Sequence, residues 1–259
     1  MLGMMVVHPR KPSDGYRVDR DFAIMLSEWM IPPGTSRPDP NAMGDFNILT
    51  MNGKAFPGTE ALVAKLGDRV RIRFGNLSAM DHHPIHLHGH YWKITATDGG
   101  DIPVSAQWPE TTVLVPTGSA RNVEFIASEP GDWAMHCHMT HHVMNQMGHG
   151  IPNMVGIDPA KLNAKVQPLL PDYMTMGHDG MSEHVKHIEM GHMAVPENSI
   201  PMVGAKGPHD YITMGGMFTI VKVREKLDSY ADPGWYVNPP GTQAMEAPAE
   251  ELKRDGIGV

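Results

Sequence analysis

The stretch HCHMTHHVMNQM begins at His136 and contains the only cysteine of the chain, Cys137. Successive side chains of a β-strand point to opposite faces, so Cys137 points one way and the flanking His136 and His138 point the other. His142 and Met147 follow at spacings typical of a turn or loop. Two histidines, one cysteine thiolate and a weak axial methionine form the blue-copper site of electron-transfer proteins. The stretch therefore predicts a copper site that requires one more histidine from elsewhere.

A second stretch, HPIHLHGH, begins at His83 and offers that histidine. His83 lies three residues before His86, with a proline between them, and can therefore point away from it. It is the natural second nitrogen ligand for a copper ion at Cys137. His86 and His88 are two residues apart and share one face of a strand, so they can join the two histidines that flank Cys137 at a second metal site.

The donor set favours copper over other metals. Imidazole suits copper, zinc, iron and nickel, but a thiolate combined with a thioether narrows the choice towards copper. A structural zinc site prefers a closed tetrahedron, often with more than one cysteine. A single cysteine is commonly a buried structural thiol, but the surrounding ligand types argue against that reading here.

The elements that must position these ligands are short strands. Apolar runs separated by turn residues predict strands within 21–30, 46–52, 62–76, 83–97 and 111–127, and a last strand ending near Cys137. We expect residues 111–127 to form a hairpin across the Pro-Thr-Gly-Ser turn. Seven or eight short strands with regular turns are typical of an all-β sandwich or barrel.

Residues 69–74 read RVRIRF and give the clearest alternation. Val70, Ile72 and Phe74 are expected to face the core. The three arginines between them are expected to face solvent, as on a half-buried strand.

The sequence changes character after about residue 166. Eight Met and five His lie between Tyr173 and Phe218, with many Gly and Pro, which predicts an irregular low-complexity segment. Residues 218–225, FTIVKVRE, predict one further strand, and the remainder from Asp228 predicts an extended tail.

Composition excludes several classes of function. The net charge is −8 with no basic run, which argues against a nucleic-acid partner. No stretch approaches the roughly 20 apolar residues that a membrane span requires. A single cysteine excludes an internal disulfide framework. The N-terminal residues do not read as a signal peptide, because their apolar run is short and no small-residue cleavage site follows.

HPIHLHGH and HCHMTHHVMNQM resemble the two copper motifs in the last cupredoxin domain of multicopper oxidases, the family of laccases, ascorbate oxidase and bacterial copper-resistance oxidases. The resemblance covers roughly residues 14–160 and implies a cupredoxin-like Greek-key β-sandwich. Carried over position by position, it implies type 1 copper ligands at His83, Cys137, His142 and Met147, a type 2 ligand at His86, and type 3 ligands at His88, His136 and His138.

The resemblance also implies a reaction. In this family the type 1 copper accepts single electrons from a reducing substrate, here expected to be phenolic or Cu(I). The Cys-His link passes them to a trinuclear copper cluster that reduces O2 to water. The resemblance further implies a periplasmic or secreted location.

Half of the expected cluster is missing. The trinuclear cluster of the family uses four His-x-His pairs, and this chain has two of them. The histidines of residues 1–82 are His8 and His82 alone, and they form no such pair. We expect the chain to be the C-terminal portion of a larger oxidase, and the resemblance to two-domain family members implies a homotrimer for the complete protein. A partner polypeptide could instead supply the missing half, or the chain could be a blue-copper module without O2 reduction. A copper nitrite reductase is a further alternative, which the second flanking histidine, His138, argues against.

The resemblance divides the chain into four parts: the end of a preceding cupredoxin domain (1–13), the copper-bearing cupredoxin domain (14–166), the irregular Met/His-rich segment (167–217), and a short strand with an extended tail (218–259). The Met/His-rich segment could capture Cu(I), because thioether is a soft ligand. The segment that directly follows His138, MTHHVMNQM, contains no carboxylate for proton delivery to O2, and Asp81, Asp132 and Glu110 are candidates only by proximity in sequence. We expect His82, His90 and His141 to lie outside the ligand set.

Overall fold

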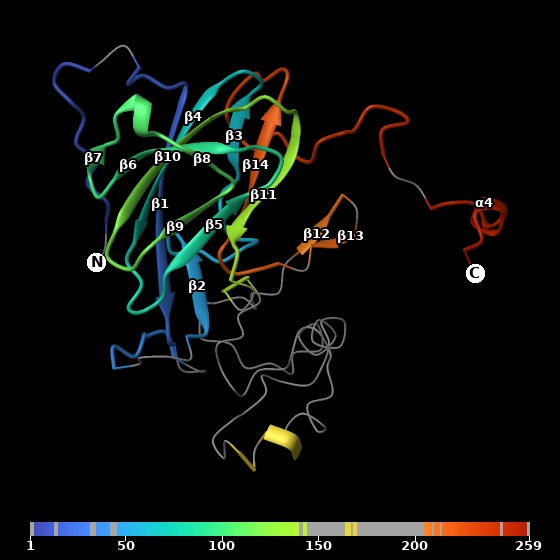
Figure 1. Ribbon diagram of the computed structural model, residues 1–259, viewed down its shortest axis with the longest axis horizontal. Coiled ribbons are helices and arrows are strands. Elements are labelled where there is room, and N and C mark those ends of the chain that lie inside the picture. The colour runs from blue at the N-terminus through green and yellow to red at the C-terminus, as the bar shows by residue number, and fades with distance from the viewer. Residues whose placement is uncertain are drawn as a thin grey trace.

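The computed structural model describes residues 3–12, 15–31, 35–41, 46–139, 142–143, 164–166, 168–169, 205–208, 210–212, 214–243 and 246–257. Within these ranges two β-sheets pack face to face and form the body of the molecule (Figure 1). The prediction of a cupredoxin-like β-sandwich is therefore confirmed. Most of the Met/His-rich segment lies outside the described residues.

The first sheet has seven strands in the order β2-β1-β4-β10-β6-β7, with β8 also paired to β6. Strands β1 and β4 run parallel, and the other neighbours are antiparallel. Its strands are β1 (Arg20–Trp29), β2 (Ile48–Met51), β4 (Arg69–Asn76), β6 (Trp92–Thr97), β7 (Gly100–Asp101), β8 (Pro109–Glu110) and β10 (Ala120–Ile126).

The second sheet has five strands in the order β3-β14-β11-β5-β9. These are β3 (Leu62–Lys65), β5 (His83–Leu87), β9 (Thr112–Val115), β11 (Gly131–Cys137) and β14 (Phe218–Arg224). Outside the two sheets lie the 3-10 turn η1 (Val104–Ala106), the small pair β12 (Ala205–Gly207) and β13 (Asp210–Ile212), and helix α4 (Ala249–Arg254).

The apolar side chains of β4 face the core, as the alternation along this strand predicts. Val70, Ile72 and Phe74 are buried and belong to the main hydrophobic cluster between the sheets. Ile85 and Met135 of the second sheet belong to the same cluster. The copper motifs therefore lie on strands that a continuous core holds in place.

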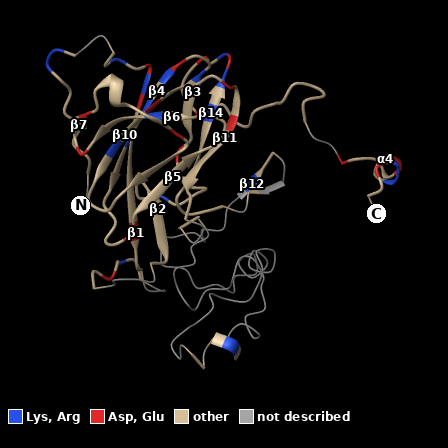
Figure 2. Cartoon of the chain, in the orientation of Figure 1, with Lys and Arg blue, Asp and Glu red and all other residues tan. Residues whose placement is uncertain are grey.

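The opposite face of β4 differs from the prediction of a solvated face. Arg71 is only 5% exposed, with its guanidinium 2.7 Å from Glu124 and 3.4 Å from Asp21. Arg69 also pairs with Glu124, and Arg73 pairs with Asp21. Period-two alternation separates apolar from polar positions, but it does not show that acidic residues of the neighbouring strands will neutralise the arginines. Figure 2 shows basic and acidic positions gathered on these strands.

The predicted hairpin across residues 111–127 is wrong. β9 pairs with β5 in the second sheet, whereas β10 pairs with β4 and β6 in the first. The turn between them, with Gly118 at φ 73°, carries the chain from one sheet to the other. A Pro-Thr-Gly-Ser turn reverses the chain in either case, so its residues alone do not distinguish a hairpin from a connection between sheets.

The predicted strand at residues 218–225 is confirmed as β14, and all seven of its residues are buried. It lies between β11 and β3, so residues far along the chain complete the sheet that carries the copper motifs. The part of the tail that follows is extended but anchored: Lys222 lies 2.6 Å from Asp232 and 4.8 Å from the Trp235 ring centroid. The predicted domain limits stay a prediction.

Candidate metal centre

Pairing of β5 with β11 brings the two histidine-rich motifs side by side. The strands are antiparallel, with His136 opposite His86 and Cys137 opposite Ile85. Because side chains alternate along both strands, Cys137 faces the core while His136 faces away from it. The predicted division of the ligands between two faces of one strand is therefore present in the structure.

On the core side, His83, Cys137 and His142 converge and are all fully buried. The Cys137 Sγ lies 3.3 Å from Nδ1 of His142 and 3.9 Å from Nδ1 of His83. The two Nδ1 atoms lie 3.1 Å apart. His83 comes from β5, Cys137 ends β11, and His142 follows in a turn closed by its N–H donating to the carbonyl of Met139.

This triangle of donor atoms has the size that a metal ion requires. The point equidistant from the three atoms lies about 2.0 Å from each, close to the lengths of about 2.0–2.3 Å for zinc–nitrogen and zinc–sulfur bonds in proteins. Two imidazoles and one thiol that converge in a buried site also match the protein ligands of a type 1 copper centre. The residues present therefore fit a copper ion.

Burial raises the pKa of the Cys137 thiol to about 12, although the Met139 amide N–H opposes the rise. The thiol is therefore protonated at neutral pH in the metal-free protein. Because the thiolate is the metal ligand, metal binding here must release that proton.

The outer ring nitrogens of both histidines have polar neighbours. The Nε2 atom of His83 is hydrogen-bonded to the Ser78 hydroxyl at 2.5 Å, and Nε2 of His142 lies 3.3 Å from Oδ2 of Asp81. A carboxylate beside Nε2 favours the proton on that nitrogen of His142, which leaves Nδ1 with its lone pair towards the thiol. Such partners fix the tautomer and orientation of metal-binding histidines.

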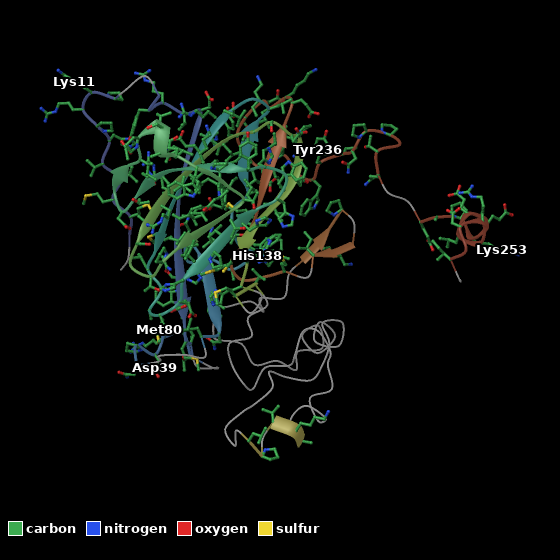
Figure 3. The ribbon with its side chains drawn as sticks, viewed as in Figure 1. Lys11, Asp39, Met80, His138, Tyr236 and Lys253 are labelled. Carbon is green, nitrogen blue, oxygen red and sulfur yellow. The ribbon has the colours of Figure 1, made fainter. Side chains whose placement is uncertain are left out.

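On the opposite face, the other four histidines form a second group, which comprises His86, His88, His136 and His138. The His86 ring centroid lies 4.9, 5.6 and 5.3 Å from those of His88, His136 and His138. The Nε2 atoms of His88 and His136 approach to 3.1 Å. His88 and His138 are exposed, so the group is open on one side. Figure 3 shows His138 at the end of β11.

His136 is the most buried member of this group. Its Nδ1 lies 2.8 Å from the Cys137 carbonyl, which can only accept, so Nδ1 carries the proton and Nε2 keeps its lone pair. Burial lowers the pKa of His136 to about 4, the hydrogen bond to the Cys137 carbonyl opposes this, and the neighbouring His88, His86 and His138 lower it further. His136 is therefore neutral at pH 7 and suited to bind a metal ion.

This pKa predicts how the stability of the metal-free protein depends on pH. Between pH 6.5 and about 4 the native state binds fewer protons at His136 than the unfolded chain does, so stability is lost as the pH falls through this window. The loss from this residue amounts to at most about 3 kcal/mol. Denaturant unfolding from pH 4 to pH 7 should show a weaker pH dependence for His136→Gln than for the wild type. Identical pH slopes would contradict the assignment.

Four further residues in or beside the two motifs are the predicted ligand Met147 and the histidines predicted to lie outside the ligand set, His82, His90 and His141. Met147, the predicted axial ligand, and His141 lie outside the described residues. His82 is exposed, and its Nδ1 accepts the Thr117 amide N–H at 3.0 Å. His90 is buried between Phe125 and Trp133.

The three carboxylates considered for proton delivery have different surroundings. Asp132 pairs with Arg224 at 2.7 Å, and Glu110 accepts from the Trp108 indole at 2.8 Å, so both have structural partners. Asp81 lies beside His142 on the core side of β11. No contact of these three with the four-histidine group is seen among the described residues.

Two residues at the site, Ser78 and Thr112, were not predicted, and Asp81 was predicted only as a candidate for proton delivery. Ser78 is hydrogen-bonded to the outer nitrogen of His83, and the Asp81 carboxylate lies 3.3 Å from the outer nitrogen of His142. Thr112 is hydrogen-bonded to Nδ1 of His86 at 2.8 Å. The position of Ser78 and Asp81 within five residues of His83 was the only signal that could have found them. Thr112 carries no signal in sequence, because only the β5–β9 register places it opposite His86.

A family model described as "Multicopper oxidase" matches residues 32–155. The chain is 38% identical over 93 residues to the multicopper oxidase MmcO of Mycobacterium tuberculosis, covering 36% of this chain and 17% of that protein. It is 30% identical over 150 residues to a probable nitrite reductase-hydroxylamine oxidoreductase fusion protein of Kuenenia stuttgartiensis, covering 57% and 16%. The chain thus spans less than a fifth of the length of these relatives.

Among solved structures, the blue copper oxidase from Nitrosomonas europaea aligns with 84% of this chain and 48% of its own length, at 22% identity and a TM-score of 0.49.

In the part of this chain that the structure describes, no helix is long and apolar enough to cross a membrane.

Proposed function

We propose that this chain carries the C-terminal cupredoxin domain of a multicopper oxidase and is the electron-accepting portion of an oxidase that reduces O2 to water. The family model that matches residues 32–155 and the similarity to MmcO support this proposal. One observation carries the proposal. The buried group of His83, Cys137 and His142 lies back to back with the four-histidine group, and β11 contributes to both. A copper site that only bound or carried copper would not need the second group.

His83, Cys137 and His142 would hold the type 1 copper, with Met147 as a proposed further ligand. His86 would bind the type 2 copper, and His88, His136 and His138 would bind the type 3 pair. Copper would supply one-electron redox chemistry at the first group and O2 reduction at the second.

The chain's own contribution is to hold and connect the two groups. Cys137 is covalently joined to both His136 and His138, so a path of bonds runs from its sulfur through the backbone to the far face of the sheet. The buried first group excludes water and keeps its donor atoms fixed. The hydrogen bond from Nδ1 of His136 to the Cys137 carbonyl leaves its Nε2 available for a metal ion.

The open side of the four-histidine group supports a missing partner. His88 and His138 are exposed, and the chain supplies only two of the family's four His-x-His pairs. We propose that a further cupredoxin domain or a neighbouring subunit, in a homotrimer for example, covers this face and completes the cluster.

The proposed reductant is a phenol or Cu(I), and the proposed location is periplasmic or secreted. Cu(I) as a substrate is favoured by the Met/His-rich sequence between Tyr173 and Phe218, whose thioethers are soft ligands. The oxidation of Cu(I) would connect the protein to copper homeostasis.

A second candidate function is electron transfer or copper binding without O2 reduction. The exposed half-cluster favours it, because two His-x-His pairs alone do not complete a trinuclear site. Nitrite reduction is less well supported, since His138 would then have no role.

Oxygen uptake distinguishes these functions. The copper-loaded protein, purified as its cells produce it, should consume O2 with a phenol or with Cu(I) and show the near-ultraviolet shoulder of a coupled copper pair. The isolated 259-residue chain should be blue but inactive. The variant His138→Ala should remain blue and lose O2 uptake. A native protein that is blue yet consumes no O2 with either reductant would refute the oxidase and support the electron-transfer function.

A further inference from the structure

Glu28, near the end of β1, is a buried carboxyl group that the proposed copper sites do not use. It is 5% exposed, and its Oε2 has no hydrogen-bond partner among the described residues. Its Oε1 accepts two backbone N–H groups, from Met80 at 2.6 Å and from Asp81 at 3.1 Å. A carboxyl group buried in this way is costly, which raises the question of what it holds in place.

The loop that Glu28 holds connects β4 to β5 and carries the two neighbours of the metal-site histidines. Ser78 is hydrogen-bonded to Nε2 of His83, and Asp81 lies 3.3 Å from Nε2 of His142. Figure 3 labels Met80 in this loop, at the end of the sandwich. Glu28 therefore contacts Asp81 directly, and Asp81 in turn lies beside the proposed ligand His142.

Other contacts fix the rest of the loop. The Asn76 side chain donates to the Asp81 and Val115 carbonyls and accepts from the Ser78 N–H. The Thr117 hydroxyl lies 2.8 Å from the Asp81 carbonyl. These contacts hold the carbonyl of Asp81, whereas Glu28 alone among the described side chains accepts its N–H. The Asp81 N–H belongs to the Met80–Asp81 peptide group, whose carbonyl also accepts from the Thr117 hydroxyl at 3.0 Å. Glu28 and Thr117 thus hold the two ends of this peptide group.

We propose that Glu28 is a positioning residue: its carboxyl oxygen fixes the loop so that the Asp81 carboxylate stays 3.3 Å from the outer nitrogen of His142 and favours the tautomer whose Nδ1 lone pair points to the metal site. The inference rests on the proposed copper site at Cys137. Partners of this kind orient metal-binding histidines, and their loss commonly weakens metal affinity by about 10-fold or more.

The electrostatic setting agrees with this role. Burial raises the pKa of Glu28 to about 7, the Met80 N–H opposes the rise, and the nearby Asp81 carboxyl raises it further. Burying a carboxyl group costs free energy. The proposed role accounts for this cost, because the two N–H groups that Glu28 accepts fix the loop beside the metal site.

Two variants separate positioning from mere stabilisation. Glu28→Ala removes the acceptor and should release the Asp81 peptide. Glu28→Gln keeps a carbonyl oxygen that can accept both N–H groups and should retain the wild-type site. Glu124→Ala is the matched control: Glu124 is a buried glutamate, 8% exposed, that pairs with arginines on the first sheet and makes no contact with this loop among the described residues.

The first measurement is ¹⁵N NMR of the His142 ring in the metal-free protein. Wild type and Glu28→Gln should show one tautomer protonated at Nε2, and Glu28→Ala should show a mixture. The second is copper affinity, which should fall about 10-fold in Glu28→Ala and stay within about 2-fold of wild type in Glu28→Gln and Glu124→Ala.

An unchanged His142 tautomer and copper affinity in Glu28→Ala would overturn the proposal and leave Glu28 a stabilising residue only. Equal losses in the Gln and Ala variants would also overturn it, because the acceptor oxygen would then not be the feature that matters. The tautomer is measured without metal, so a wild-type protein that binds no copper would refute the proposed function while the NMR result still tests Glu28.

Discussion

Replacing Cys137 with serine is expected to abolish the blue colour of the copper-loaded protein. Cys137 is the only cysteine of the chain, and its sulfur lies within 3.9 Å of both Nδ1 atoms of the site. The colour arises from charge transfer between thiolate and copper, and a serine hydroxyl, a harder ligand that is protonated at neutral pH, cannot replace it. Electron delivery to the four-histidine group should be lost together with the colour.

The same variant should remain folded. Exchanging a buried sulfur for a hydroxyl costs about 1–3 kcal/mol, less than the stability of a typical domain. The circular dichroism spectrum should therefore match the wild type. His82→Gln is the matched control, since His82 lies beside His83 in sequence but is exposed and contacts Thr117. Colour that survives in Cys137→Ser would contradict the assignment, as would colour lost in His82→Gln.

Replacing Gly89 with alanine is expected to destabilise the protein more than any conservative surface change. Gly89 has φ 70°, and an added Cβ would overlap ring carbons of Trp133. That ring cannot move easily, because its indole N–H donates to the Glu129 carbonyl at 3.0 Å and the His90 ring lies against it at a near right angle, with 5.6 Å between the ring centroids. We expect a loss of about 3–5 kcal/mol, of which about 1–2 is backbone strain and the rest overpacking.

Gly99→Ala separates these two contributions. Gly99 has a similar φ of 81°, but nothing lies within 4 Å of the added Cβ. This control should lose only about 1–2 kcal/mol in urea unfolding. Equal losses in the two variants would show that contact with Trp133 is not the cause. Because Gly89 follows His88, the displaced backbone should also disturb the four-histidine group.

The two metal groups could be predicted because their ligands follow the period of a strand. Cys137 and His136 are adjacent and so face opposite ways, while His86 and His88 are two apart and share a face. These rules need only residue types and spacing. The pairing of β5 with β11 then follows, since the ligands must meet.

Other features depend on partners distant in sequence. The route of the chain from β9 to β10 was mispredicted because one turn sequence serves both a hairpin and a connection between sheets. The burial of Arg71 depends on Glu124 and Asp21 in neighbouring strands. Glu28 and Asp81 are 53 residues apart, and only the folded sandwich brings the Glu28 carboxyl to the loop beside the proposed copper site.

The measurement that tests the central claim most directly is X-ray absorption of the chain loaded with one equivalent of copper. A site made by His83, Cys137 and His142 predicts one short copper–sulfur bond and two nitrogen neighbours at bonding distance, together with a blue solution. Copper surrounded only by nitrogen and oxygen, in a colourless solution whose buried thiol remains protonated, would contradict the account.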